Sequence, residues 1–299
     1  MDKFLYFTDL HYGSNPVSRK DNYNESLLSK LIFILKLARK NKCVVLHGGD
    51  LFDKPNIKMT DMLRLMSIFK DYSDVRFISL RGNNNHDGHL EQSPLRLLEL
   101  AGLIETSDDL NFIEFPNTRI HFADNNTDPN IMMEPNFTDK LNILMTHHII
   151  VEKPTIYKHF LISELKTDAD IVLIADYHPY QGIIEREDGV TFVSPGATAR
   201  RKHTKHEINR VPKCIFIKSD GKLKEIDFPV QHDIWANPDK IEEISKVDTR
   251  EEVESMMILI DEDGMTDVSI ESMLEAFGKT MKLNTKTLEY IMKNMENLT

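Results

Sequence analysis

Cysteine, tryptophan and long apolar runs are scarce in this 299-residue chain, which has two Cys and one Trp. Cys43 and Cys214 lie in separate short apolar runs, so they provide no disulfide framework, and a reducing, cytoplasmic setting is expected. No apolar run approaches the roughly 20 residues that span a bilayer, so we expect no membrane partner. The N-terminal MDKFLYFTDLHYG is too short and too acidic for a signal peptide, and predicts a first strand.

Positive charge is also in short supply, because 37 Lys plus Arg face 48 Asp plus Glu, for a formal net charge of −11. Such a charge argues at first against a nucleic-acid partner. The excess lies mostly in residues 231–299, which hold 16 acidic and 7 basic residues, a net of −9. Residues 1–230 therefore carry a net of only −2, and a nucleic-acid partner is not excluded for that part of the chain.

Short apolar runs alternate with helix-period stretches along residues 1–230, which predicts a mixed α/β fold. The predicted strands are 3–8, 43–47, 75–80, 111–115, 119–123, 141–146, 170–175, 182–186, 190–194 and 213–218. The predicted helices are 24–40, 59–71, 94–101 and 157–166. Asp-Gly pairs in EDGV at 187–190 and SDGK at 219–222 predict two hairpin turns.

The character of the chain changes near residue 231, so we expect a main domain at 1–230 and a small helical segment at 231–299. Residues 266–282 and 286–298 each repeat apolar side chains at helical spacing. Many of these apolar residues are Met. Two interpretations stay open: a small helical cap packed on its own core, or an adaptable Met-rich face that docks a partner.

Side chains that commonly bind metals follow five of the predicted strands directly. They are Asp9, His11, Asp50, Asp53, Asn85, His86, Asp87, His147, His148, Asp176 and His178. Each alone has an ordinary explanation, such as a turn cap or a core histidine. Together, at strand ends that would share one rim of an α/β fold, buried carboxylates and imidazoles require a neutralising cation. A set of Asp, Asn and His without Cys favours Mn²⁺, Fe²⁺ or Zn²⁺ with open positions over a closed structural zinc.

The motifs that contain these residues carry a family resemblance. DLH at 9–11, GGDLFD at 48–53, NHD at 85–87, THH at 146–148 and DYH at 176–178 resemble the five motifs of calcineurin-like metallophosphoesterases. Within that superfamily, GGDLFDKPN and SPGATARRKHTKHE are similar to the nuclease subunit of the SbcC–SbcD exonuclease complex and its phage and eukaryotic relatives. The resemblance covers about residues 1–230. It implies a four-layer α/β fold, a β-sandwich flanked by helices, with a small helical C-terminal segment.

The resemblance also implies two divalent metal ions, with Mn²⁺ favoured and Mg²⁺, Fe²⁺ and Zn²⁺ as alternatives. One ion would be held by Asp9, His11, Asp50 and His178. The other would be held by Asp50, Asn85, His147 and Asp176, with Asp50 bridging. Catalysis would fall to His86, which would face the scissile phosphate, and to Asp87 beside it. Asp53, Asp87 and His148 would support the imidazoles that bind metal.

Two positions depart from the family pattern. The third motif normally has Gly directly before its Asn-His pair, and here Asn84 stands in that place. An alternative register, Gly82-Asn83, leaves no adjacent His, so the sequence favours Asn85 as the ligand. The fifth motif normally has His where Asp176 stands. A carboxylate is a competent ligand for hard cations, so Asp176 is either a replacement ligand or the sign of a weakened second site.

A basic stretch at 199–213 predicts a phosphate-binding patch, although a solvated loop is the alternative. The DNA-binding side chains expected there are Arg200, Arg201, Lys202 and Lys205. The favoured function is a two-metal DNA exonuclease or endonuclease in recombination, repair or replication. Its partners would be DNA and an SMC-like coiled-coil ATPase of the SbcC type, with homodimerisation open, in a bacterial cell or a phage-infected host. The alternatives are a stand-alone phosphoesterase acting on a nucleotide or phosphoprotein, and a non-catalytic scaffold of the same fold.

Overall fold

The computed structural model describes most of the first 236 residues. The described ranges are 2–83, 85–89, 92–107, 111–132, 139–155, 157–202 and 204–236. The chain divides into two units, Met1–Pro238 and Asp239–Thr299. The predicted C-terminal helical segment lies almost wholly outside the described residues, so it stays a prediction.

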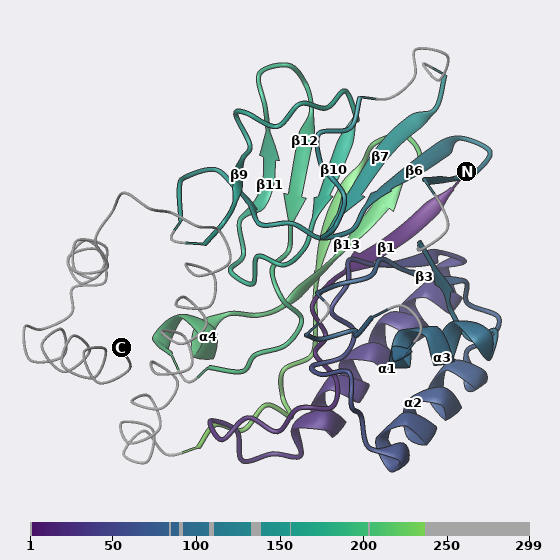
Figure 1. The fold of residues 1–299 in the computed structure, drawn as a ribbon, viewed down its shortest axis with the longest axis vertical. Coiled ribbons are helices and arrows are strands. Elements are labelled where there is room, and N and C mark those ends of the chain that lie inside the picture. The colour runs from purple at the N-terminus through teal and green to yellow at the C-terminus, as the bar shows by residue number, and fades with distance from the viewer. Residues whose placement is uncertain are drawn as a thin grey trace, which may run out of the picture. The chain divides into compact units, whose positions relative to one another are not determined.

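Two six-stranded mixed sheets form the centre of the first unit (Figure 1). The first sheet has the order β14 (Leu223–Asp227), β13 (Lys213–Lys218), β1 (Lys3–Phe7), β2 (Val44–His47), β3 (Phe77–Ser79) and β4 (Glu105–Thr106). The second has the order β11 (Gly182–Glu185), β12 (Thr191–Ser194), β10 (Ile171–Ile174), β7 (Leu141–Thr146), β6 (Thr118–Ala123) and β5 (Phe112–Glu114). This arrangement confirms the predicted α/β fold class.

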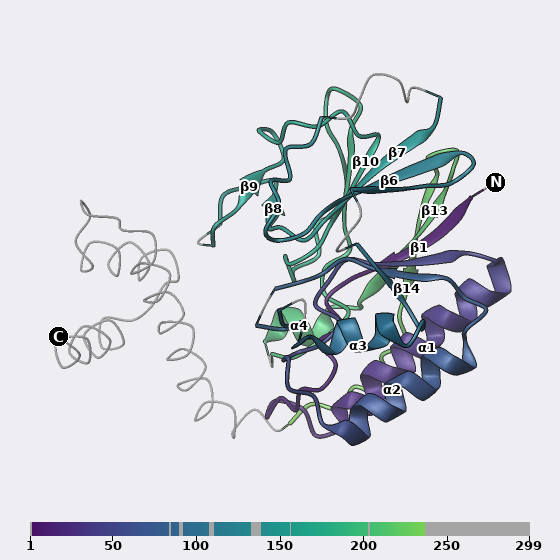
Figure 2. The same ribbon diagram turned by 45° about the vertical axis from the view of Figure 1, so that its right-hand side comes forward.

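Alternation along β1 shows why the sheets stack face to face. Phe4 and Tyr6 point into the apolar layer between the two sheets, and Leu5 and Phe7 point to the opposite face. That opposite face packs against the helices α1 (Tyr23–Asn41), α2 (Met59–Asp71) and α3 (Pro94–Leu100), which Figures 1 and 2 show on one side of the sheet. Within the described residues, no helix is long and apolar enough to cross a membrane.

The parallel strands position the motifs. β1, β2 and β3 run parallel in the first sheet, and β7 and β10 run parallel in the second. The five predicted motifs follow the C-terminal ends of these five strands. The Tyr6 hydroxyl donates to the carbonyl oxygen of Ile174 at 2.8 Å and ties the two sheets together beside these ends. The carboxyl edges of both sheets therefore contribute side chains to a common region.

The helix predicted at 157–166 is wrong. Phe160–Leu161 instead forms a short strand, β9, which pairs parallel with β8 (Ile150–Val151). Ile162 and Leu165 become buried in the apolar cluster outside the second sheet, so tertiary packing outweighs the helical spacing. Both Asp-Gly turns are confirmed: β11–β12 and β13–β14 are antiparallel pairs, with Gly189 and Gly221 at positive φ. The sequence analysis did not predict four of the strands, β4, β8, β9 and β14. It also did not predict the short helix α4 (Lys205–Asn209).

Candidate metal centre

Unusual backbone conformations gather where the motifs meet. Five non-glycine residues in the described part of the chain have positive φ, and four of them are Asp9 (53°), His11 (48°), Asp50 (54°) and Asp176 (67°). The fifth, Lys42, caps the C-terminus of α1. Left-handed backbone is costly for residues with a Cβ, and it persists where the surrounding structure holds a functional geometry. The surrounding structure therefore holds these four residues in a costly backbone conformation, which fixes the direction of their side chains.

The first group of ligands comes from motifs one, two and five. The ligand atoms of Asp9, His11 and His178 all lie within 4.8 Å of one another. His178 Nε2 is 3.0 Å from His11 Nε2 and 3.7 Å from Asp9 Oδ1, and His11 Nε2 is 3.9 Å from Asp50 Oδ2. Asp9 and His11 are fully buried, whereas the His178 side chain is 43% exposed. The group thus opens to solvent, and so to a substrate, at His178.

The second group shares Asp50 with the first. His147 Nε2 lies 3.5 Å from Asp50 Oδ1 and 3.9 Å from Asp176 Oδ1. His147 Nδ1 is 2.8 Å from the carbonyl oxygen of Gly48, which can only accept, so Nδ1 donates this hydrogen bond and Nε2 is the nitrogen that faces the carboxylates. Asp50 faces one group with each of its carboxylate oxygens. The structure therefore brings together six of the seven predicted metal ligands, with Asp50 between the two groups.

Electrostatics show that these groups are unbalanced without a cation. Burial, reinforced by the charges of Asp50 and Asp176, raises the pKa of Asp9 to about 8. Burial and the charge of Asp50 also raise the pKa of Asp176. Burial opposes protonation of His147, but the carboxylates of Asp50, Asp176 and Asp9 raise its pKa well above the ordinary value. Asp9 Oδ1 and His147 Nε2 are buried and make no hydrogen bond among the described residues, so the donor set fits divalent cations.

The third motif adopts the register that the sequence analysis set aside. The Asn83 side chain donates from Nδ2 to Asp176 Oδ1 at 3.1 Å, and its backbone N–H donates to Asp50 Oδ1 at 2.7 Å. Asn85 is exposed, and none of the contacts found among the described residues joins it to these groups. The structure therefore places Asn83, and not the predicted Asn85, beside these groups. Asn84, which stands in the Gly position of the motif, lies outside the described residues.

Gly82 gives the physical reason for this register. A Cβ at Gly82 would lie 2.0 Å from Asp50 Oδ1 and 2.2 Å from the Asp50 backbone nitrogen, so only glycine allows this approach. The backbone N–H groups of His86 and Asp87 both donate to the Asn83 carbonyl at 2.9 Å, which holds His86 next to Asn83. An adjacent His is therefore not needed. We call Asp9, His11, Asp50, Asn83, His147, Asp176 and His178 the metal cluster.

His86 and Asp87 occupy different environments. His86 Nδ1 donates to the Asp53 carbonyl at 2.7 Å, its Nε2 lies 3.8 Å from Asp50 Oδ2, and its side chain is 27% exposed. Asp87 is fully buried and accepts hydrogen bonds from the backbone N–H groups of Asp50, Phe52 and Gly82 at 2.9–3.0 Å. Its pKa is raised to about 6 by burial and the charge of Asp50. Asp87 thus holds the backbone at Asp50, Phe52 and Gly82 in place, whereas the His86 side chain is partly exposed at the edge of the cluster.

The remaining supporting residues lie beside the cluster. Asp53 Oδ1 is 3.6 Å from His11 Nδ1 and 2.7 Å from Arg201 Nη1, so an arginine, a carboxylate and an imidazole are in line. His148 contacts the Thr146 hydroxyl at 2.6 Å through Nδ1 and packs edge-on against Phe160. Asp53 therefore lies beside an imidazole of the cluster, at a distance too long for a hydrogen bond. His148 braces the strand end that presents His147.

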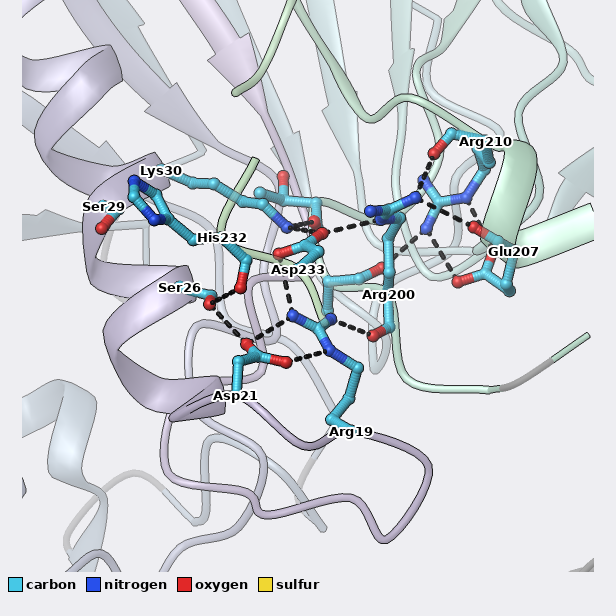
Figure 3. Close-up of polar contacts among 12 residues, drawn as sticks. Arg19, Asp21, Ser26, Ser29, Lys30, Arg200, Glu207, Arg210, His232 and Asp233 are labelled. Carbon is cyan, nitrogen blue, oxygen red and sulfur yellow. Dashed lines mark hydrogen bonds and ion pairs between the residues drawn. The ribbon is translucent and has the colours of Figure 1, made fainter. Parts of the chain in front are cut away.

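Arg200, predicted as a DNA contact, is buried in the structure, with its side chain only 4% exposed. Its Nε donates to Asp233 Oδ2 at 2.7 Å, and its Nη1 donates to the carbonyl oxygens of Ile208 and Arg210 (Figure 3). Arg201 is 34% exposed and stays a predicted DNA contact. Lys202 and Lys205 also stay predictions, and the Lys205 side chain lies outside the described ones.

Arg200 belongs to a separate buried assembly, which we call the ion network. Its members are Arg19, Asp21, Lys30, Arg200, Glu207, Arg210 and Asp233. Asp233 lies at its centre and accepts hydrogen bonds from Arg19 at 2.8 Å, Lys30 at 3.1 Å and Arg200 at 2.7 Å (Figure 3). The segment just beyond residue 230 therefore packs on the main domain.

With the fold and cluster described, the comparisons with known proteins define the class. The family model of calcineurin-like phosphoesterases matches residues 2–206, and the chain belongs to this family. The chain is also similar to two DNA double-strand break repair proteins named Mre11. It is 27% identical to that of Methanosarcina acetivorans over 177 residues, covering 54% of this chain and 28% of the relative. It is 27% identical to that of Aeropyrum pernix over 88 residues, covering 29% of this chain and 21% of the relative.

The matched segments thus span less than a third of each relative's length. Among solved structures, the protein TT1561 of Thermus thermophilus is 11% identical with a TM-score of 0.45, and the match covers 76% of this chain and 98% of that one.

Proposed function

We propose that this chain is a two-metal phosphodiesterase that acts on DNA as a nuclease. The observation that carries the proposal is Asp50, which is buried and presents its two carboxylate oxygens to two different groups of potential ligands. One group is Asp9, His11, Asp50 and His178. The other is Asp50, Asn83, His147 and Asp176. A phosphoesterase with two such groups around one carboxylate is suited to in-line displacement at phosphorus.

The chemistry divides between the ions and the chain. When bound, two divalent ions supply Lewis-acid stabilisation of the charge that develops on the phosphodiester. The chain contributes the proton donor, because His86 uses Nδ1 for the Asp53 carbonyl and keeps Nε2 free at the exposed side of the cluster. A cationic His86 can donate its Nε2 proton to the departing alkoxide. Asp87 keeps the Asp50 and Gly82 backbones fixed while this occurs.

DNA is the proposed substrate on two grounds. Two relatives of this chain are named as DNA double-strand break repair proteins. Arg201 also places a partly exposed cation next to Asp53, at the edge of the metal cluster. Phosphate contacts of this type position a nucleic acid without reading its sequence. Partnership with an SMC-like coiled-coil ATPase, through the segment at 231–299, is part of the same proposal and rests on the family resemblance.

A second candidate follows from the burial of Arg200. Because this residue is tied to Asp233, the predicted cationic patch is smaller than the sequence indicated. A stand-alone phosphodiesterase acting on a nucleotide or another small substrate would need only the metal cluster. Both candidates require metal and His86, so they differ only in the substrate that is preferred. A non-catalytic scaffold would require neither.

Hydrolysis assays with Mn²⁺ separate these functions. We expect the wild-type chain to cleave linear duplex or single-stranded DNA, and also a small aryl phosphodiester at a lower kcat/KM. Activity should disappear with a chelator and return with Mn²⁺. Turnover of the aryl substrate alone would favour the stand-alone enzyme. No turnover of any substrate at saturating Mn²⁺ would contradict the proposal and support the scaffold.

A further inference from the structure

A chain of two carboxamides ends at the second group of ligands. Asn125 follows β6, Asn83 follows β3 and Asp176 follows β10, so three separate segments meet. Asn125 Nδ2 donates to Asn83 Oδ1 at 2.7 Å, and Asn83 Nδ2 donates to Asp176 Oδ1 at 3.1 Å. Both hydrogen bonds have ordinary lengths. The orientation of Asn83 is thus coupled to that of Asn125.

This orientation is the wrong one for binding a cation. The atom of Asn83 that faces Asp176 is Nδ2, a donor that has no lone pair for a metal. The oxygen that could bind an ion faces Asn125 instead. A half-turn about the last side-chain torsion exchanges the two atoms, and this torsion is broad and roughly two-fold in asparagine. Asn83 can therefore present oxygen to the cluster without moving its backbone.

Such a turn places new demands on Asn125. The Asn83 NH₂ group would then face Asn125, which must offer an acceptor in place of its own NH₂ group. Asn125 carries that acceptor: its Oδ1 is buried and makes no hydrogen bond among the described residues. A buried carboxamide oxygen without a partner is costly, and the paired turn would satisfy it.

We infer that Asn125 is a positioning residue that turns together with Asn83 and holds the Asn83 oxygen toward the second metal position. The inference rests on the proposed two-metal function and extends it to a residue outside the five motifs. Asn125 touches neither substrate nor ion. It favours the binding orientation of a ligand, and outer partners of this kind are worth about 10–100-fold in metal affinity.

Two substitutions at 125 separate this role from general packing. Asn125→Asp can only accept, so its carboxylate holds the Asn83 NH₂ group and keeps the Asn83 oxygen facing the cluster. Asn125→Leu offers no acceptor. The neighbouring Asn126 is exposed and provides matched controls. Asn126→Asp adds the same charge nearby, and Asn126→Leu adds the same apolar group, without the contact to Asn83.

Calorimetric titration of the full chain with Mn²⁺ is the test, with elemental analysis of the ions retained. We expect two ions in the wild type, a second-site affinity about 10–100-fold weaker in Asn125→Leu, and a second site in Asn125→Asp tighter than in Asn126→Asp. Unchanged affinity in Asn125→Leu would overturn the inference while leaving two-metal binding intact. Fewer than two ions in the wild type would instead contradict the proposed function, and the inference with it. Should Asn125→Leu fail to fold, equal affinities in the two Asp variants would overturn the inference.

Discussion

The metal cluster and the ion network are both buried groups of ionisable side chains, but they differ in how their charges are balanced. In the ion network, each cation meets an anion: Asp233 alone accepts from Arg19, Lys30 and Arg200, and Glu207 pairs with Arg210 at 2.7 Å. In the metal cluster, the carboxylates lie close to one another and to imidazole nitrogens, and the described side chains of Lys and Arg do not pair with them in the way seen in the ion network. Every charged side chain of the ion network has a partner of opposite charge, whereas the metal cluster requires cations.

The difference teaches that burial of charge does not by itself identify a functional site. The ion network ties the loop before α1, α1 itself, the residues in and around α4 and the residues just beyond 230 to one another, so its paired charges serve stability and position. The metal cluster leaves Asp9 Oδ1 and His147 Nε2 without hydrogen bonds among the described residues. Four of its residues also have positive φ, a costly backbone conformation for a residue with a Cβ. Buried polar atoms without hydrogen bonds, together with left-handed backbone at non-glycine residues, therefore distinguish the metal cluster as the candidate functional site.

The largest expected effect breaks the metal cluster at its centre. Asp50→Ala should lose both ions and all measurable hydrolysis, because one carboxylate serves both groups. His86→Ala should keep both ions and lose about 10²–10⁴-fold in kcat, because it removes only a proton donor. Elemental analysis beside steady-state kinetics measures both quantities. Equal metal loss in the two variants would contradict the roles assigned to Asp50 and His86.

The next effect breaks the ion network and should leave the metal cluster intact. Asp233→Ala leaves three buried cations without their shared anion, so we expect the free energy of unfolding to fall by about 3–5 kcal/mol. The folded fraction should still bind two Mn²⁺ ions. Denaturant unfolding measures the loss. Asp74→Asn, which removes an exposed partner of Arg39, is the matched control and should change stability much less.

Truncation tests the same network in another way. A chain that ends after Val230 lacks Asp233, whereas one that ends after Ala236 keeps it. We expect only the longer chain to reach wild-type thermal stability in the main domain. If both are equally stable, the domain ends near residue 230 as the sequence indicated, and Asp233 contributes little.

A smaller effect uses pH to compare the cluster with and without metal. The pKa of Asp9 is raised from 3.8 to about 8 by burial, so the neutral form favours folding and that stability is lost as pH rises toward 8. In a chelator, Asp9→Asn should gain about 1–3 kcal/mol relative to wild type between pH 5 and pH 8.5, because Asn stays neutral. With Mn²⁺ the sign should reverse, since a ligand is lost. Thermal unfolding at the two pH values decides between these outcomes.

The smallest effect concerns Arg201. Arg201→Gln should weaken DNA binding uniformly across sequences and reduce the slope of log affinity against log salt by about 1. Cleavage of a small aryl phosphodiester should change little by comparison. If both activities fall in parallel, Arg201 serves Asp53 and His11 and not DNA.

The motifs at strand ends could be read from the sequence because the chemistry is local. Each short apolar run stops at Asp or His, and parallel strands bring such ends to one edge. The register of motif three could not be chosen in this way. The sequence favoured Asn85 for its neighbour His86, but the deciding fact is the contact between Gly82 and Asp50, which lie far apart in the chain.

Arg200 and residues 157–166 show a different limit. Sequence reveals the charge of Arg200 but not its burial, which depends on Asp233 arriving from the far side of the domain. Likewise, the spacing at 157–166 suits a helix, but pairing of β9 with β8 outweighs it. Both errors come from long-range packing that composition and periodicity do not encode. Asn125 escaped notice because no motif contains it.

The most direct test of this account is Mn²⁺ titration of the wild type, Asp50→Asn and Asp176→Ala, with the number of bound ions as the readout. The account predicts two ions per chain in the wild type, none at comparable affinity in Asp50→Asn, and one in Asp176→Ala. A single ion in the wild type, or two ions retained in Asp50→Asn, would contradict the claim that one carboxylate joins two metal positions.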